Sequence, residues 1–164
     1  MKRPVSLLAS LAAGALAAAG AAVVLAPVGT ATAATVKPIP GIRSPSGNIR
    51  CLFVPPARGA SAPNLLCTIG HADYSAALQQ RCIGSPTNLD WHGWELPAAR
   101  RGAVTCSGGI LYDPGTQRPT YTTLPYGRTW RSGPFTCVSR RSGVTCTNSH
   151  GHGLFISRQS WRAW

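Results

Sequence analysis

Acidic side chains are scarce in this sequence. Asp and Glu together number 4 among 164 residues, against 16 Lys and Arg, which gives a formal charge of +12. Catalysis by paired carboxylates, as in glycosidases, needs two acids that face each other across a cleft. No pattern brings any two of the acids together, and we interpret them as solvated or paired with arginine: Asp73, Asp90, Glu95 and Asp113.

Motifs of common hydrolases and nucleotide-binding proteins are also missing. The chain has no G-x-S-x-G sequence, which carries the serine nucleophile of α/β-hydrolases. Gly151-His152-Gly153 lacks the strand-to-helix context of a phosphate-binding loop. We therefore predict no catalytic residue, no cofactor and no specific recognition of nucleic acid.

The first 33 residues have the pattern of a secretory signal peptide. Lys2 and Arg3 precede a long apolar run, and Ala31-Thr32-Ala33 is a small-residue cleavage motif. The run is also long enough for an uncleaved membrane anchor, which is the competing interpretation. Because alanine and glycine dominate the run and are weak membrane formers, we expect cleavage after Ala33 and a secreted, extracellular protein.

All six cysteines lie after residue 33, and an even number in an exported chain predicts three disulfides. No two of them have the close spacing of zinc ligands, so we predict no metal site. Six cysteines allow 15 pairings. The sequential pairing encloses short loops and is our prediction: Cys51 with Cys67, Cys82 with Cys106, and Cys137 with Cys146.

One hairpin near the C-terminus has a register that the sequence predicts. If residues 140–143 form a four-residue turn, Ser139 faces Val144 and Cys137 faces Cys146. Side chains alternate across a strand, so one face of the hairpin then collects apolar residues and cysteines, while the other is mainly threonine. Directly opposed residues of an antiparallel pair lie close enough for a disulfide.

The rest of the chain predicts short strands and little helix. Residues 49–53 and 65–69 read as a second hairpin with a disulfide across it. Residues 72–82 predict a short helix capped by Asp73, and residues 107–120 a long loop. After the last strand, Ser157 is expected to cap one helical turn, which would place Trp161 and Trp164 as a lid on the sheet.

These segments define an all-β fold class, a small disulfide-stapled hairpin sandwich or barrel-like domain with little helix. Residues 34–43 contain two prolines and no periodic pattern, so we expect an extended leader there. The predicted organisation is a signal peptide (1–33), the leader (34–43) and a single disulfide-bonded β domain (44–164).

The resemblance to a known family rests on four motifs. They are Ser44 to Cys51 (SPSGNIRC), Leu124 to Gly127 (LPYG), Gly143 to Asn148 (GVTCTN) and Gly151 to Gly153 (GHG). In combination they resemble a family of small secreted actinobacterial proteins with six cysteines and a domain of unknown function. The resemblance covers most of residues 42–164. It implies a secreted, disulfide-bonded domain and brings no activity or ligand with it.

Two groups of residues are candidates for ligand binding. Tyr126, Arg128 and Trp130 would share one strand face, with Arg131 beside them, and alternating aromatic and arginine side chains stack on rings and neutralise anions. The alternative is an edge strand in which Trp130 packs inward. His150 and His152 would point the same way on an extended chain, whereas the alternative is a glycine-rich turn in which one histidine bonds the backbone.

Without Lys2 and Arg3 the chain keeps 14 basic and 4 acidic residues, a formal charge of +10, which favours anionic partners. A GC-rich genome would produce similar arginine usage whatever the partner. We expect a monomeric, non-catalytic interaction module for anionic cell-wall or extracellular polymers, or for another secreted protein. The alternatives are a small secreted hydrolase, ribonuclease-like or glycan-acting, that uses His150, His152 and an acid, or a protein inhibitor that presents the 107–120 loop.

Overall fold

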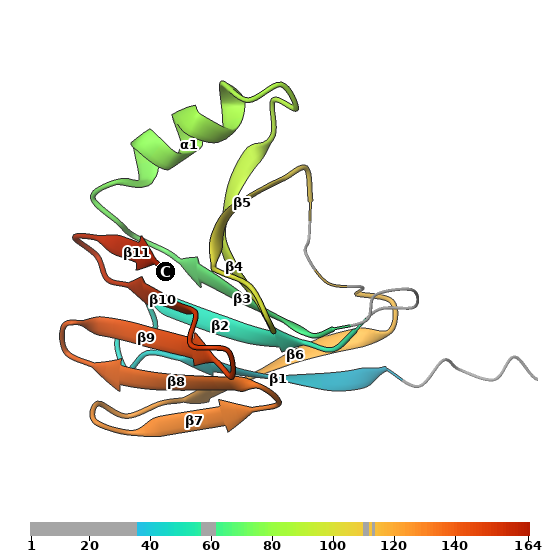
Figure 1. Ribbon diagram of the computed structural model, residues 1–164, viewed down its shortest axis with the longest axis vertical. Coiled ribbons are helices and arrows are strands. Elements are labelled where there is room, and N and C mark those ends of the chain that lie inside the picture. Colours follow the sequence, from blue (N-terminus) through green and yellow to red (C-terminus); the bar gives the residue numbers. More distant parts are fainter. Residues whose placement is uncertain (1–35, 57–61, 110–111, 113) are drawn as a thin grey trace, which may run out of the picture. The chain divides into compact units, whose positions relative to one another are not determined.

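Two β-sheets make up most of the described chain. The computed structural model describes residues 36–56, 62–109, 112 and 114–164 (Figure 1). The predicted signal peptide therefore lies outside the described residues, as does Asp113. All described residues belong to the unit Ala34–Trp164.

The first sheet has six strands in the order β5-β4-β3-β2-β1-β6. Only the β1–β6 pair is parallel. The predicted hairpin over residues 49–69 is confirmed, with Cys51 opposed to Cys67. The strands are β1 (Lys37–Arg43), β2 (Ile49–Val54), β3 (Asn64–Ile69), β4 (Asp90–Pro97), β5 (Ala103–Ser107) and β6 (Gln117–Thr123).

The second sheet is an antiparallel meander in the order β11-β10-β9-β8-β7. Its central hairpin has the predicted register, because Ser139 is opposed to Val144 and Cys137 to Cys146. The strands are β7 (Thr129–Ser132), β8 (Phe135–Arg140), β9 (Gly143–Asn148), β10 (Gly153–Ile156) and β11 (Trp161–Ala163).

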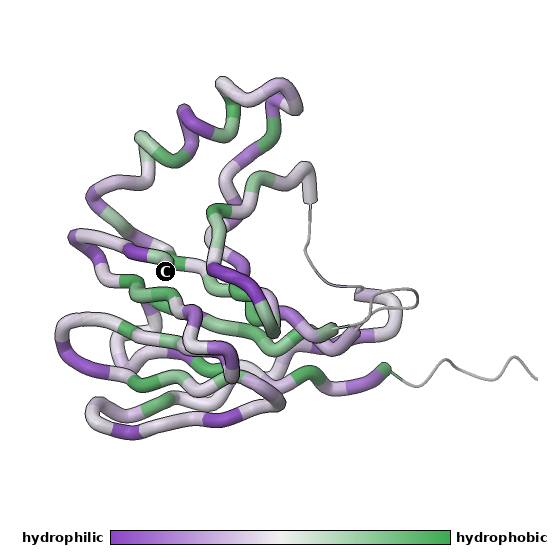
Figure 2. The backbone as a smooth tube through the Cα atoms, viewed as in Figure 1, coloured by the Kyte–Doolittle hydropathy of each residue, from purple (hydrophilic) through white to green (hydrophobic). Residues whose placement is uncertain are grey.

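The hydrophobic core joins the two sheets, so the predicted all-β sandwich is confirmed. Alternate residues of β2 and β3 on one side and of β8, β9 and β10 on the other are fully buried in one cluster. All three predicted disulfides are present. Two of them meet in the core, where the sulfur atoms of Cys51 and Cys146 are 4.0 Å apart. Figure 2 shows the apolar residues along these strands and the hydrophilic ones at the turns.

One short helix, α1 (Ser75–Ile83), lies beyond β4 and β5 (Figure 1). The helix begins after Tyr74 and has no side-chain cap, so the expected cap by Asp73 is wrong. Asp73 lies one residue too early, and its carboxylate instead accepts a bond from Arg158 at 3.2 Å. Leu78 is buried, and Cys82 joins the helix to β5 through Cys106. Among the described residues, no helix is long and apolar enough to cross a bilayer.

Three further segments differ from expectation. Most of the expected leader is strand β1, whose Ile39 and Ile42 are buried, so this extended segment is part of the sheet. The expected 107–120 loop ends at Gln117, where β6 begins, and residues 110, 111 and 113 lie outside the described part. After Ser157 the chain forms a turn and then β11 in place of a helical turn, because the backbone pairs with β10.

Candidate functional site

Three arginines line one pocket at an end of the sandwich. Arg140 ends β8 and Arg141 follows it in the turn to β9, whereas Arg158 comes from the turn between β10 and β11. The pocket has a volume of about 140 Å³, and serine residues of both turns and of the chain before β2 also line it. We call Arg140, Arg141 and Arg158 the arginine site.

Local turn chemistry explains why these side chains project. Arg140 is opposed to Gly143, so Arg141 and Ser142 form a two-residue loop whose side chains are exposed. In the other turn the Ser157 hydroxyl donates to the Ser160 carbonyl and accepts from the Ser160 amide, both at 3.0 Å. This closed turn leaves Arg158 at its exposed tip. Both turns are strongly hydrophilic in Figure 2.

The arginine site carries more positive charge than its surroundings balance. The Arg158–Asp73 bond is the only ion pair within the described part of the chain, and both side chains are more than half exposed. The guanidinium of Arg141 stacks 5.3 Å from the ring centre of Tyr126. Within those same residues, neither Arg140 nor Arg141 has a hydrogen-bond or carboxylate partner for its side chain. Two guanidinium groups are therefore free to contact anions.

A tyrosine side chain is hydrogen-bonded to the turn between β10 and β11. The Tyr74 hydroxyl donates to the Ser157 carbonyl at 2.8 Å. Burial, with a smaller contribution from the Asp73 carboxylate, raises the pKa of Tyr74 to about 12. The hydroxyl therefore keeps its proton to a higher pH than an ordinary tyrosine does, and it donates to the turn that carries Arg158.

The structure separates the predicted residues Tyr126, Arg128, Trp130 and Arg131. Tyr126 and Arg128 precede β7, and the stacking on Arg141 places Tyr126 beside the arginine site. The Arg128 backbone pairs with Ser139, next to Arg140. Trp130 packs against the core, and Arg131 is exposed on β7, an edge strand. Tyr126 and Arg128 thus lie outside the strand that carries Trp130, and Trp130 packs inward, as in the alternative.

The two predicted histidines lie at the opposite end of β9, in the turn to β10. The Asn148 side-chain oxygen accepts bonds from the backbone amides of His150 and His152, at 3.0 and 3.1 Å. The Nδ1 atom of His150 is 3.2 Å from the Ala98 carbonyl oxygen. No bond joins either histidine to a carboxylate among the described residues. This geometry is that of the glycine-rich turn, the alternative to a histidine pair that acts together.

Within the described ranges, one group of three possible metal ligands lies close together: Cys51, Cys67 and Cys146. All three sulfur atoms are in disulfides, so none of these cysteines is a thiolate that could bind a metal ion in the oxidised chain.

Sequence reasoning missed the arginine site itself. The sequence Arg140-Arg141 predicts a turn, and two adjacent arginines at a turn also indicate exposed positive charge. Nothing in the sequence around Arg158 indicates that it joins this pair, because it reaches the pocket from a separate turn.

The fold and this site define a class: a disulfide-linked β-sandwich with a cationic pocket formed by turns. The sequence model of a family of unknown function, DUF6636, matches residues 19–162, so the chain belongs to that family. This agrees with the expected domain of unknown function, whereas the actinobacterial source stays a prediction. No curated protein and no solved structure matches the chain significantly.

Proposed function

We propose that the protein is an exported, monomeric, non-catalytic module that binds anionic polymers of the cell wall or extracellular space. The observation that carries this proposal is the arginine site, where Arg140 and Arg141 project without a carboxylate partner beside Arg158. Arginine binds phosphate and carboxylate groups through charge-assisted, often bidentate hydrogen bonds. A polymer presents many such groups in series, which suits an open pocket between turns.

Export is part of the same proposal. It is supported by Lys2-Arg3, the apolar run and the Ala31-Thr32-Ala33 motif at the N-terminus. Three disulfides are typical of chains that fold in oxidising compartments.

The first test measures binding of the disulfide-bonded protein to inorganic polyphosphate at increasing ionic strength. The Debye length falls from about 10 Å at 0.1 M salt to about 3 Å at 1 M, so binding through exposed arginines should weaken steeply. Dextran, an uncharged polymer, serves as the ligand control. Binding that ignores salt, or equal binding to dextran, would contradict the proposal.

The second test separates the arginine site from the general charge of the chain. The variant Arg140→Gln/Arg141→Gln/Arg158→Gln should bind polyphosphate about tenfold more weakly. The matched control Arg81→Gln/Arg100→Gln/Arg118→Gln loses the same net charge from exposed positions on α1, a loop and β6. It should keep most of the affinity. Equal losses in both variants would show that binding depends on net charge alone.

A further inference from the structure

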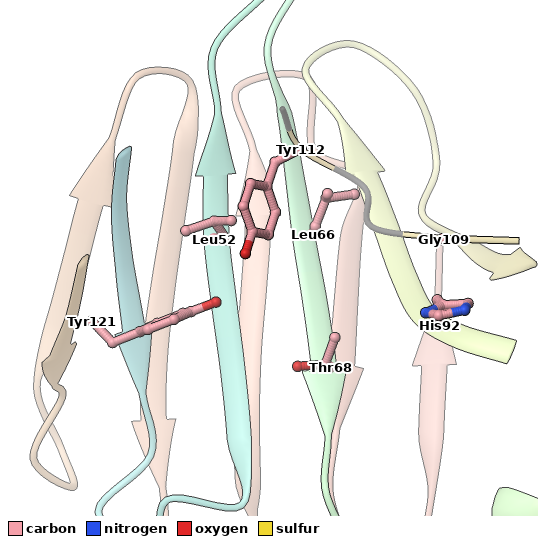
Figure 3. Close-up of a pocket in the computed structure, with 7 residues that line it drawn as sticks. All are labelled: Leu52, Leu66, Thr68, His92, Gly109, Tyr112 and Tyr121. Atoms are coloured by element: carbon pink, nitrogen blue, oxygen red, sulfur yellow. The ribbon is translucent and has the colours of Figure 1, made fainter. Parts of the chain in front are cut away.

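A larger pocket, of about 330 Å³, lies on the outer face of the six-stranded sheet. Leu52 and Leu66 form its floor (Figure 3). They are opposed residues of β2 and β3, and they point outward because their neighbours Cys51 and Cys67 point into the core. The pocket shares no lining residue with the arginine site.

Two tyrosine rings form the walls. Tyr112 and Tyr121 both extend over the floor, and their hydroxyl groups point into the pocket (Figure 3). The Tyr121 ring lies over Gly41 of β1, where a Cβ atom would come within 2.8 Å of it. Any larger residue at Gly41 would therefore displace this wall. Burial raises the pKa of Tyr121, the Tyr112 hydroxyl adds to this rise, and the Arg50 guanidinium opposes it.

A cation, Arg50, lies beside two of the residues that line the pocket, Thr68 and Tyr121. Arg50 is two residues before Leu52 on the same outward face of β2, and it is opposed to Thr68 on β3 and to Arg43 on β1. Its guanidinium carbon lies 5.9 Å from the ring centre of Tyr121. Thr68, which lines the pocket, therefore has a cation beside it, and His92 also lines the pocket.

Among the described residues, an acid lies on this face of the sheet across Leu66 from Arg50. Glu95 of β4 is opposed to Leu66, and its carboxylate accepts a bond from Asn64 at 2.9 Å. An anionic group in the pocket would be repelled from Glu95 and attracted to Arg50. The charges thus set a direction for a ligand, with the apolar part on the leucines and the anion toward Arg50 and Thr68.

Size narrows the class of ligand further. The volume of about 330 Å³ suits a small molecule. It lies at the small end of ligand pockets, about 300 to 1,000 Å³. The floor is hydrocarbon and the walls are aromatic, which favours a planar ring in offset or edge contact with the tyrosines over a sugar.

We propose that this pocket binds a small aromatic acid, with its ring on Leu52 and Leu66 between the two tyrosines and its carboxylate toward Arg50 and Thr68. The proposal does not depend on polymer binding at the arginine site, because the two sites have no lining residue in common.

The experiment is an NMR amide-shift titration of the disulfide-bonded protein with phenylacetate. Two probes of the same size serve as controls: phenylacetamide, which lacks the charge, and octanoate, which lacks the ring. We expect saturable shifts at Leu52, Leu66 and Thr68. Phenylacetamide should bind about tenfold more weakly, since a hydrogen bond to a charged group is lost, and octanoate should also bind more weakly because it cannot stack.

Two variants test the residues. Arg50→Gln should weaken phenylacetate binding about tenfold, whereas Arg81→Gln, an equal charge loss on α1, should not. Tyr112→Ala removes one wall of the pocket. Because Tyr112 lies outside every strand, the variant should still fold, and its affinity for phenylacetate should fall about fivefold.

Four outcomes would overturn the proposal. They are the absence of saturable shifts, shifts confined to Ser142 and Gly143 at the arginine site, equal binding of phenylacetamide, and equal or tighter binding of octanoate. The last would assign the pocket to acyl chains, and the second would assign the ligand to the arginine site.

Discussion

At the scale of single residues, Tyr74 links the helix end to the turn that carries Arg158. Burial and Asp73 raise the pKa of its hydroxyl from 10.0 to about 12, so the folded protein holds this proton more tightly than the unfolded chain does. The resulting stabilisation is complete below pH 10 and is lost as the pH rises toward 12. We expect the free energy of unfolding to fall more steeply over that window in the natural protein than in Tyr74→Phe.

Urea denaturation at a series of alkaline pH values measures this difference. Tyr126→Phe is the matched control, because Tyr126 is exposed and has no hydroxyl bond in the described structure. Its pH dependence should follow that of the natural protein. Parallel curves for the natural protein and Tyr74→Phe would show that this hydroxyl does not titrate differently in the folded state.

At the scale of elements, α1 depends on its disulfide. The helix has nine residues and no side-chain cap, and it buries only Leu78 and Cys82. A helix this short is marginal without tertiary contacts. Cys82→Ala/Cys106→Ala should lower the free energy of unfolding by about 2–4 kcal/mol, and hydrogen exchange should rise first in α1.

Amide hydrogen exchange with the sandwich as internal reference checks this prediction. The amides of β8 and β9 should keep their order of protection, because the disulfide between Cys137 and Cys146 remains in this variant. A uniform rise over both sheets would mean that the bridge stabilises the whole fold and not α1 alone.

The elements that the sequence predicts well are local. Each hairpin joins neighbouring segments, and opposed cysteines give its register, as for Cys137 and Cys146. Strand β1 was missed because Pro38 and Pro40 break the alternation, and because its parallel partner β6 is about 80 residues away. Gly41 suggests a loop when the sequence is read alone. The structure explains the glycine, because the Tyr121 ring covers this position and leaves no room for a side chain.

The same distinction applies to the candidate sites. The sequence grouped Tyr126 with Arg128, Trp130 and Arg131, whereas in the structure the Tyr126 ring stacks on Arg141. Arg158 joins the arginine site through another turn, and the outer pocket needs residues of β2, β3, β4 and β6 together. Long-range pairing of this kind leaves no pattern in a single segment.

At the scale of the whole molecule, the sheet edges favour the proposed monomer. An exposed edge strand offers unpaired backbone groups to another chain, and short strands, charges and proline counter this. Strand β6 has Arg118 and Pro119, β7 has four residues with Arg131 exposed, and β11 has three with Arg162 exposed. At the remaining edge, β5 is joined to α1 by a disulfide.

This arrangement predicts that one edge arginine can control self-association. Sedimentation equilibrium should give a molecular mass for the natural protein that does not change with concentration. Arg131→Val removes a charge from β7 and adds a residue that favours strands, so its mass should rise with concentration. Arg81→Val, an equal change on α1, should remain monomeric. A concentration-independent mass for Arg131→Val would mean that the short length of β7, and not its charge, prevents pairing, whereas a dimeric natural protein would contradict the monomer itself.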